Sequence, residues 1–117
     1  MINLERKGDV FIMTLDSGEN RWNTSFVRKL SGLLDEVVNS TGPAALVTAS
    51  ASEKFFSNGL DLGWIQNPQD FPAAGNREVF ASEFMSLMAR LITLPMPSIC
   101  AVNGHAFGAG IMAAMCH

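Results

Sequence analysis

The chain has 117 residues, of which 8 are Lys or Arg and 11 are Asp or Glu, so its formal net charge at pH 7 is −3. With 48% hydrophobic and 16% charged residues it is too apolar for a disordered tail, and it lacks the basic cluster expected of a nucleic-acid-binding protein. No apolar run reaches the roughly 20 residues of a membrane span, and the charged segment MINLERKGDV has no apolar signal region, so we expect an intracellular protein without a secretory signal.

The first part of the chain predicts a β-hairpin followed by a helix. Two β-prone runs, 2–7 and 10–16, flank a Gly-Asp turn, and the second run alternates in a way typical of a strand. After a turn-rich loop over 16–23, apolar residues recur at spacings of three and four from about Thr24 to Ser40, which predicts an amphipathic helix. Thr24 or Ser25 is the predicted N-cap, and a Gly-Pro pair ends the helix.

The middle of the chain predicts two strands, a short helix and a loop. The apolar run 44–49 is typical of a buried parallel strand, and Phe55 and Phe56 form a shorter one. A short helix is expected over 61–65 with Asp61 as its N-cap. The Pro- and Asn-rich stretch 67–76 predicts a loop.

The last part predicts a helix, a strand, a turn and a final helix. Asn76 would cap a helix that continues to about Thr93, and a third buried strand is expected over 98–103. After the glycine-rich turn 104–110, a helix over 111–116 is apolar on every face and therefore needs cover on all sides. We expect a longer chain to supply that cover, or alternatively a partner chain. The order of elements favours an α/β fold with right-handed crossovers.

Two glycine-bearing turns carry the clearest functional signal. The segments 55–61 (FFSNGLD) and 103–110 (NGHAFGAG) each follow an apolar strand and open a helix, which is where open α/β sheets bind ligands. Two free backbone N–H groups that converge there would form an oxyanion hole, although glycine also serves such turns for conformational reasons alone. The second turn spells G-x-x-x-G-x-G without a following Lys, which argues against a nucleotide phosphate loop.

Side chains offer weaker candidates. Ser57 and His105 are conceivable partners in a nucleophilic triad, but no nucleophile-elbow motif surrounds the serine. The histidine is expected to be a packed side chain rather than a general base. Cys100 and Cys116 lie in apolar runs and are expected in the core, and their spacing to the histidines is not that of a zinc site. Met85, Met88, Met112 and Met115 of the two last helices are also expected in the core, or alternatively as the lining of an acyl pocket.

With these turns, the chain resembles the crotonase superfamily of enoyl-CoA hydratases and isomerases. The matching segments are 53–62 (EKFFSNGLDL) and 97–110 (PSICAVNGHAFGAG), and the loop 19–23 (ENRWN) fits as well. Together they cover almost the whole chain, in order and at the family spacing. Within the superfamily the two turns are most similar to Δ3,Δ2-enoyl-CoA isomerases, including peroxisomal ones.

The resemblance implies a fold and a site. The fold is an α/β spiral of β-β-α turns. Residues 1–117 are expected to be a partial domain without its C-terminal part, ending after the strand, turn and helix that carry the second of two oxyanion-hole donors. The backbone N–H groups of Leu60 and Ala109 would bind the thioester carbonyl of an acyl-CoA. The residues implied in substrate binding are Arg21, Trp22, Ser57, Asn58, Gly59, Leu60, Asp61 and Gly108, with Arg21 or Lys54 as a phosphate contact.

The resemblance also sets limits. Hydratases of the family carry a Glu where this chain has Met112, which cannot act as an acid or base, so an isomerase of fatty-acid β-oxidation is expected. The isomerase base would lie beyond residue 117. The resemblance implies no metal or redox cofactor. It implies a homotrimer or a hexamer. The expected location is the peroxisome, with the mitochondrion and the cytosol as alternatives. The alternative function is an inactive short form that binds acyl-CoA or associates with full-length subunits.

Overall fold

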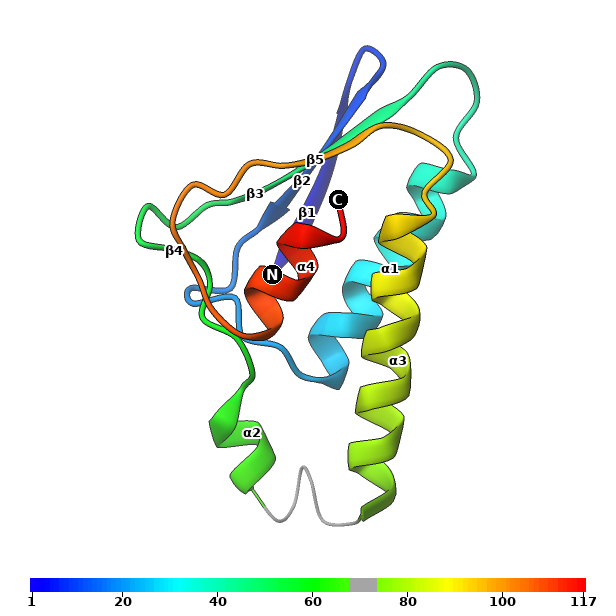
Figure 1. Ribbon diagram of the computed structural model, residues 1–117. Helices are drawn as coiled ribbons and strands as arrows, with labels where there is room; N and C mark the ends of the chain where they lie inside the picture. Colours follow the sequence, from blue (N-terminus) through cyan, green and yellow to red (C-terminus); the bar gives the residue numbers. More distant parts are fainter. Residues whose placement is uncertain (68–73) are drawn as a thin grey trace.

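The computed structural model describes residues 1–67 and 74–117, and within them two strands followed by a helical segment recur three times (Figure 1). The first unit is β1 (Ile2–Lys7), β2 (Val10–Leu15) and α1 (Thr24–Val38). The second is β3 (Ala45–Ser50), β4 (Phe55–Ser57), α2 (Leu62–Gln66) and α3 (Ala74–Ile92). The third is β5 (Ser98–Cys100), β6 (His105–Ala106) and α4 (Ala109–Met115). This order agrees with the expected β-β-α spiral.

Both strands of the first unit and the first strand of each other unit build a four-stranded sheet in the order β1-β2-β3-β5. The predicted hairpin pairs β1 with β2 antiparallel, whereas β2, β3 and β5 run parallel. Phe11, Met13 and Leu15 of β2 are buried, and the register sets Phe11 beside the buried Leu46 of β3. The alternation predicted for β2 is therefore confirmed, with one face of the sheet turned to the helices.

Helices α1 and α3 lie side by side against this buried face (Figure 1). The apolar residues of α1 are buried except for Val38. On α3, Phe84, Leu87, Met88 and Leu91 are buried, while Val79 and Ile92 are exposed. Arg28 forks onto the carboxylate of Glu83 at 2.8 and 2.9 Å, and Arg90 reaches Asp35 at 2.6 Å. No helix in the described ranges is long and apolar enough to cross a membrane.

Several helix boundaries differ from the prediction; α4, for example, spans Ala109–Met115 rather than 111–116. The N-cap of α1 is Asn23, not Thr24 or Ser25, because its extended backbone (φ −141°) lets Oδ1 accept the N–H of Phe26 at 2.9 Å. The helix ends at Val38 rather than Ser40. Helix α3 begins at Ala74, so Asn76 lies inside it and is not its cap. Most of the loop predicted over 67–76 lies outside the described residues.

The strand predicted over 98–103 ends at Cys100, because the side chain of Asn103 takes over the pairing. Oδ1 of Asn103 accepts the backbone N–H of Ser50 at 3.1 Å, and Nδ2 of Asn103 donates to the carbonyl of Ser50 at 2.7 Å. A two-residue strand, β6, then lies within the predicted turn. It exists because it pairs with β4, a long-range partner that local sequence does not reveal.

The last helix covers the molecule with only one face. Ala109, Gly110 and Ala113 are buried against the body, whereas Met112 and Met115 are 46% and 79% exposed. The expectation that the methionines lie in the core is thus wrong for these two and for Met85, and holds for Met88. Because α4 is apolar on every face and only one face is buried, its other face leaves an exposed apolar surface.

Candidate functional site

The two glycine turns meet because β4 and β6 are parallel neighbours. The carboxyl ends of parallel strands lie at the same edge, so the segments after Ser57 and after Ala106 leave the small sheet side by side. Gly59 has a φ of +81° and Gly108 a φ of +49°, which L-residues rarely adopt. A Cβ atom on Gly59 would lie 3.0 Å from the carbonyl oxygen of Phe107 and 3.9 Å from the nitrogen of Ala109. The two turns are therefore in direct backbone contact.

The amide of Leu60 lies in a single bridge with Trp22. Trp22 donates its N–H to the carbonyl of Gly59 at 2.8 Å and accepts the N–H of Asp61 at 2.9 Å. In a parallel bridge the residue between these two bonds turns its own N–H away from the partner. The N–H of Leu60 accordingly has no acceptor among the residues that the structure describes, and Leu60 is 36% exposed.

The amide of Ala109 is the first of α4, where a helix has no internal acceptor. The next amide, of Gly110, donates to Phe107 at 2.8 Å, and that of Met112 donates to Gly108 at 3.1 Å. No acceptor for the N–H of Ala109 occurs in the described part of the chain, and the residue is 7% exposed. The structure thus brings the two turns together, and the amides of Leu60 and Ala109, the two residues that the resemblance implies as donors, are unpaired within the described residues.

A buried polar network lies directly behind the first turn. Ser57 is fully buried, and its hydroxyl donates to the carbonyl of Asn20 at 2.7 Å and accepts the indole N–H of Trp22 at 3.0 Å. The Trp22 ring packs edge-on against Phe26 and Phe84. The side chains of Ser57 and Trp22 therefore face the core, and these two residues reach the site through their backbones. Sequence reasoning did not predict that Asn20 belongs to this network. The signal that could have indicated it was an Asn within a turn-rich loop.

Arg21 and Glu19 form an ion pair at 2.5 Å beside the first turn. Arg21 also donates to the carbonyl of Leu60 at 3.1 Å, and hydrogen bonds from Arg21 and Asn58 lower the pKa of Glu19. Glu19 is consequently a weak base. Arg21 stays next to the site, as predicted, but its charge is already paired within the chain.

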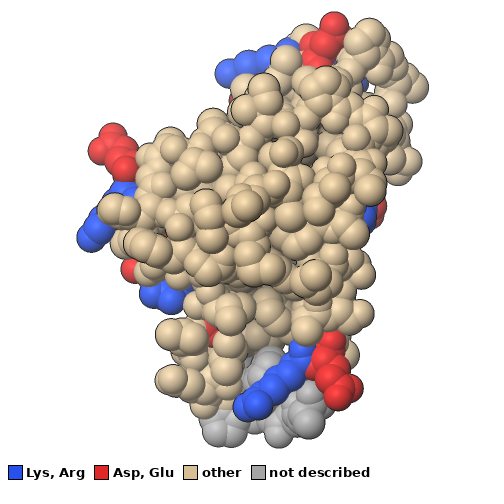
Figure 2. Space-filling model, in the orientation of Figure 1, with Lys and Arg blue, Asp and Glu red and all other residues tan. Residues whose placement is uncertain are grey.

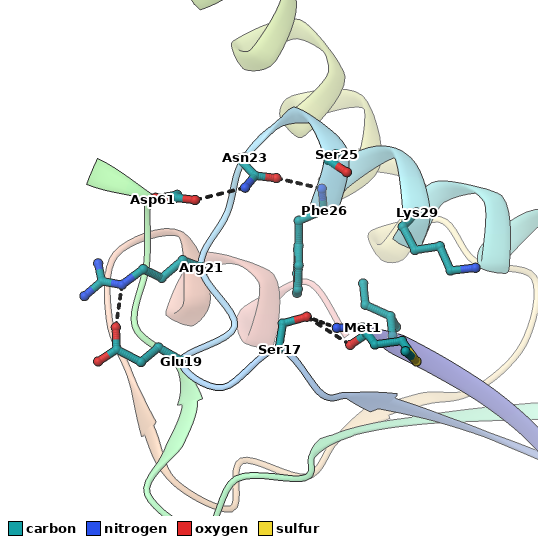
Figure 3. A pocket seen from close by; sticks show the side chains of 10 residues that line it. Met1, Ser17, Glu19, Arg21, Asn23, Ser25, Phe26, Lys29 and Asp61 are labelled. Carbon is teal, nitrogen blue, oxygen red and sulfur yellow. Dashed lines mark hydrogen bonds and ion pairs between the residues drawn. The ribbon is translucent and has the colours of Figure 1, made fainter. Parts of the chain in front are cut away.

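A cavity of about 490 Å³ opens next to this ion pair (Figure 3). Arg21, Glu19 and Asp61 line one side, and Lys29 of α1 lies on the other. Asp61 is the N-cap of α2, as predicted, accepting the N–H of Trp64 at 3.0 Å, and it also accepts the side-chain amide of Asn23 at 3.0 Å. Two cations and two carboxylates thus face a space large enough for a polar ligand.

The remaining candidate side chains do not gather at the turns. His105 is exposed and stacks on Phe107 with ring centroids 5.7 Å apart. Burial raises the pKa of the Cys100 thiol to about 11, which makes it a poor nucleophile at neutral pH. In the described ranges, no three His, Cys, Asp or Glu side chains are grouped as metal ligands.

Comparison with known proteins adds the family context. Residues 5–117 match the family model described as enoyl-CoA hydratase/isomerase. The chain is 37% identical over 119 residues to the Arabidopsis thaliana protein named enoyl-CoA delta isomerase 2, peroxisomal, covering all of this chain and 50% of that protein. It is 34% identical over 118 residues to the Arabidopsis enoyl-CoA delta isomerase 3, with 49% of that protein covered. The chain therefore spans about half the length of the curated relatives that it matches.

Solved structures agree with the fold. Pseudomonas aeruginosa DspI superposes with a TM-score of 0.86 at 25% identity, over 98% of this chain and 43% of that one. An enoyl-CoA hydratase from Bacillus anthracis gives a TM-score of 0.87 at 21% identity, over 98% of this chain and 44% of that one, which bears on the fold alone.

Proposed function

Because the chain belongs to the enoyl-CoA hydratase/isomerase family, we propose that its two glycine turns bind the thioester carbonyl of an acyl-CoA. One observation carries this proposal: Leu60 and Ala109 each present an unpaired amide on turns that touch at Gly59 and Gly108. Such a donor contributes on the order of 3 kcal/mol to stabilising an oxyanion. The remaining implied contacts, Asn58, Asp61 and Arg21, lie around the same turn.

The reaction we propose for the complete protein is a Δ3,Δ2-enoyl-CoA isomerisation in fatty-acid β-oxidation. A base removes a proton from C2 of a 3-enoyl thioester, the negative charge rests on the thioester oxygen between the two amides, and a proton returned to C4 leaves a 2-enoyl product. No electrons are gained or lost, so the proposed reaction takes no redox cofactor, and the two amides rather than a metal ion are proposed to stabilise the charge. The names of the Arabidopsis relatives favour the isomerase and a peroxisomal location.

The base in this scheme lies outside the residues of this chain. Met112 has no proton to exchange, the pKa of Glu19 is lowered by its partners, and Asp61 is engaged as a helix cap. By itself the chain is therefore proposed to bind and polarise the thioester without turning it over. The homotrimer or hexamer implied by the resemblance belongs to the same proposal for the complete protein.

The test exploits the position of Ala109 at the start of α4. Proline is well tolerated at the first helical position, where it removes the amide hydrogen that the proposal needs and puts a ring carbon in its place. We expect the Ala109→Pro variant to fold and to lose roughly tenfold or more in its preference for octanoyl-CoA over the thioether S-octyl-CoA, which lacks the carbonyl. Isothermal titration calorimetry measures both affinities.

Ala109→Ser, which keeps the amide, is the matched control and should retain the preference. Equal affinity of the unaltered chain for the thioester and the thioether would refute carbonyl binding at this site. Circular dichroism of the proline variant separates loss of the donor from loss of the fold.

A second role, association with a full-length relative, is favoured by the exposed apolar surface over α4. Figure 2 shows that the face bearing α4 is free of charged residues over a broad central area. Exposed apolar patches of this kind mark interaction sites. Co-elution of the chain with a full-length enoyl-CoA delta isomerase in size-exclusion chromatography would support this role, and separate elution would count against it.

A further inference from the structure

Atoms of Ser57, which lies in the first glycine turn, reach both the second turn and the loop before α1. Its hydroxyl accepts the amide N–H of Gly59 at 3.4 Å, in addition to its bonds with Asn20 and Trp22. A serine hydroxyl has one hydrogen to donate and two lone pairs to accept, so all three capacities are used. Because Ser57 is fully buried, water does not compete for these bonds.

The backbone of the same serine holds the second turn. Its carbonyl accepts the N–H of Phe107 at 3.0 Å. A Cβ atom on Gly110 would lie 2.6 Å from that carbonyl oxygen and 2.7 Å from the Ser57 Cβ, so the start of α4 packs directly on this residue. Phe107 and Gly110 flank Ala109 on both sides, and therefore Ser57 sets where the Ala109 amide lies.

The network behind the serine is itself rigid. Asn20, fully buried with a φ of +49°, donates its side-chain amide to Ser50 at 2.8 Å and to the carbonyl of Phe56 at 3.0 Å. Its Oδ1 accepts the N–H of Ser17 at 2.8 Å. The carbonyl that receives the Ser57 hydroxyl thus has a fixed position.

We propose that Ser57 is a positioning residue that holds the Leu60 and Ala109 amides at a fixed separation, so that both bind one carbonyl oxygen. This inference rests on the proposed function, because it names the residue that shapes the same site. Ser57 does not touch the ligand. It acts through Gly59 on one donor and through Phe107 and Gly110 on the other.

The test compares Ser57→Ala with Ser50→Ala. Both serines are buried members of the Asn20 network, but the Ser50 hydroxyl, which the substitution removes, makes no hydrogen bond to either glycine turn. The readout is the infrared stretching frequency of octanoyl-CoA labelled with ¹³C at the thioester carbonyl, together with its affinity relative to S-octyl-CoA. Two well-placed donors lower this frequency, which a loss of stability alone does not change.

We expect the unaltered chain and Ser50→Ala to lower the carbonyl frequency on binding. Ser57→Ala should bind S-octyl-CoA normally, shift the frequency less, and lose roughly two- to tenfold in its preference for the thioester. Ser57→Cys, which keeps the size and a weak donor, should recover part of the shift.

Should Ser57→Ala not fold, Trp22→Phe tests the same hypothesis, because it removes the indole N–H that the hydroxyl accepts, together with part of the buried ring. A full frequency shift in the folded Ser57 or Trp22 variant would overturn the positioning role. Absence of any shift in the unaltered chain would instead refute the proposed function itself, so the two failures are distinguishable.

Discussion

Residue-level packing at Gly110 decides how closely α4 approaches the first turn. Alanine is favoured over glycine in a helix by up to about 1 kcal/mol, but a Cβ here would lie 2.6–2.8 Å from atoms of Ser57. Overpacking of this kind costs about 1–3 kcal/mol. We therefore expect Gly110→Ala to lower the free energy of unfolding, measured by urea denaturation.

Gly32, in the middle of α1, is the matched control for this substitution. A Cβ there meets nothing within 4 Å, and the residue is exposed. Gly32→Ala should raise the free energy of unfolding by about 0.5–1 kcal/mol. A Gly110→Ala variant that gains as much stability as Gly32→Ala would show that α4 can move away from Ser57.

The thiol of Cys100 provides a second residue-scale prediction. Burial raises its pKa to about 11, so at pH 8 only on the order of one thiol in a thousand is ionised. We expect slow alkylation by iodoacetamide at pH 8 and a rate that increases steeply up to about pH 11. Mass spectrometry of the Cys100 peptide measures this rate. Labelling in the folded chain as fast as in urea would contradict the burial of this thiol.

At the scale of elements, the cap of α1 tests a boundary that the sequence alone placed one or two residues too late. Asn23 both caps α1 and donates to Asp61, the cap of α2. Asn23→Ala should lower the free energy of unfolding by about 1 kcal/mol. Thr24→Ala, at the predicted cap, should change it by less than about 0.5 kcal/mol. The opposite order of the two effects would restore Thr24 as the cap.

His117 ties the end of α4 to the large sheet. One ring nitrogen lies 2.8 Å from the carbonyl of Ala113 and the other 2.9 Å from the hydroxyl of Thr48 on β3. Burial lowers the pKa of His117 below its ordinary value of 6.5, and the Ala113 carbonyl partly opposes the shift. The neutral ring is therefore the form that the folded chain favours.

The sign of the pH dependence follows from this lowered pKa. Above pH 6.5 the ring is neutral in both states, and below it the unfolded chain binds the proton first, so stability falls as the pH drops towards the folded pKa. We expect the melting temperature to decrease more between pH 7.5 and 5.5 in the unaltered chain than in His117→Gln. The carboxylates are common to both, so equal decreases would rule out a contribution from His117.

At the scale of the whole molecule, charge and apolar surface are separated. Lys, Arg, Asp and Glu lie around the edge of the view in Figure 2, while the surface over α4 exposes Ile111, Met112 and Met115. We expect the chain to self-associate at high concentration and Met115→Lys to weaken this, measured by light scattering coupled to size-exclusion chromatography. Met85→Lys, at an exposed methionine of α3, is the control and should have the smaller effect.

Local sequence was sufficient for several elements that are specified by residues close together in the chain, although not for the Asn23 cap of α1. The hairpin β1–β2, the alternation of β2, the stripe of α1 and the Asp61 cap are all confirmed. Each depends on side-chain periodicity or on a bond between residues a few positions apart. The two glycine turns were also visible in this way, and their similarity to a known family identified Leu60 and Ala109.

Only the tertiary structure decided the features that depend on distant partners. Strand β6 exists through its pairing with β4, the strand before it is cut short by the Asn103 side chain, and the side chain of Trp22 is buried behind the first glycine turn. The role proposed for Ser57 has the same origin, because its partners Asn20 and Phe107 are 37 and 50 residues away in the sequence. Periodicity and propensity act over a few residues, whereas hydrogen bonds across such separations form only when the whole chain has folded.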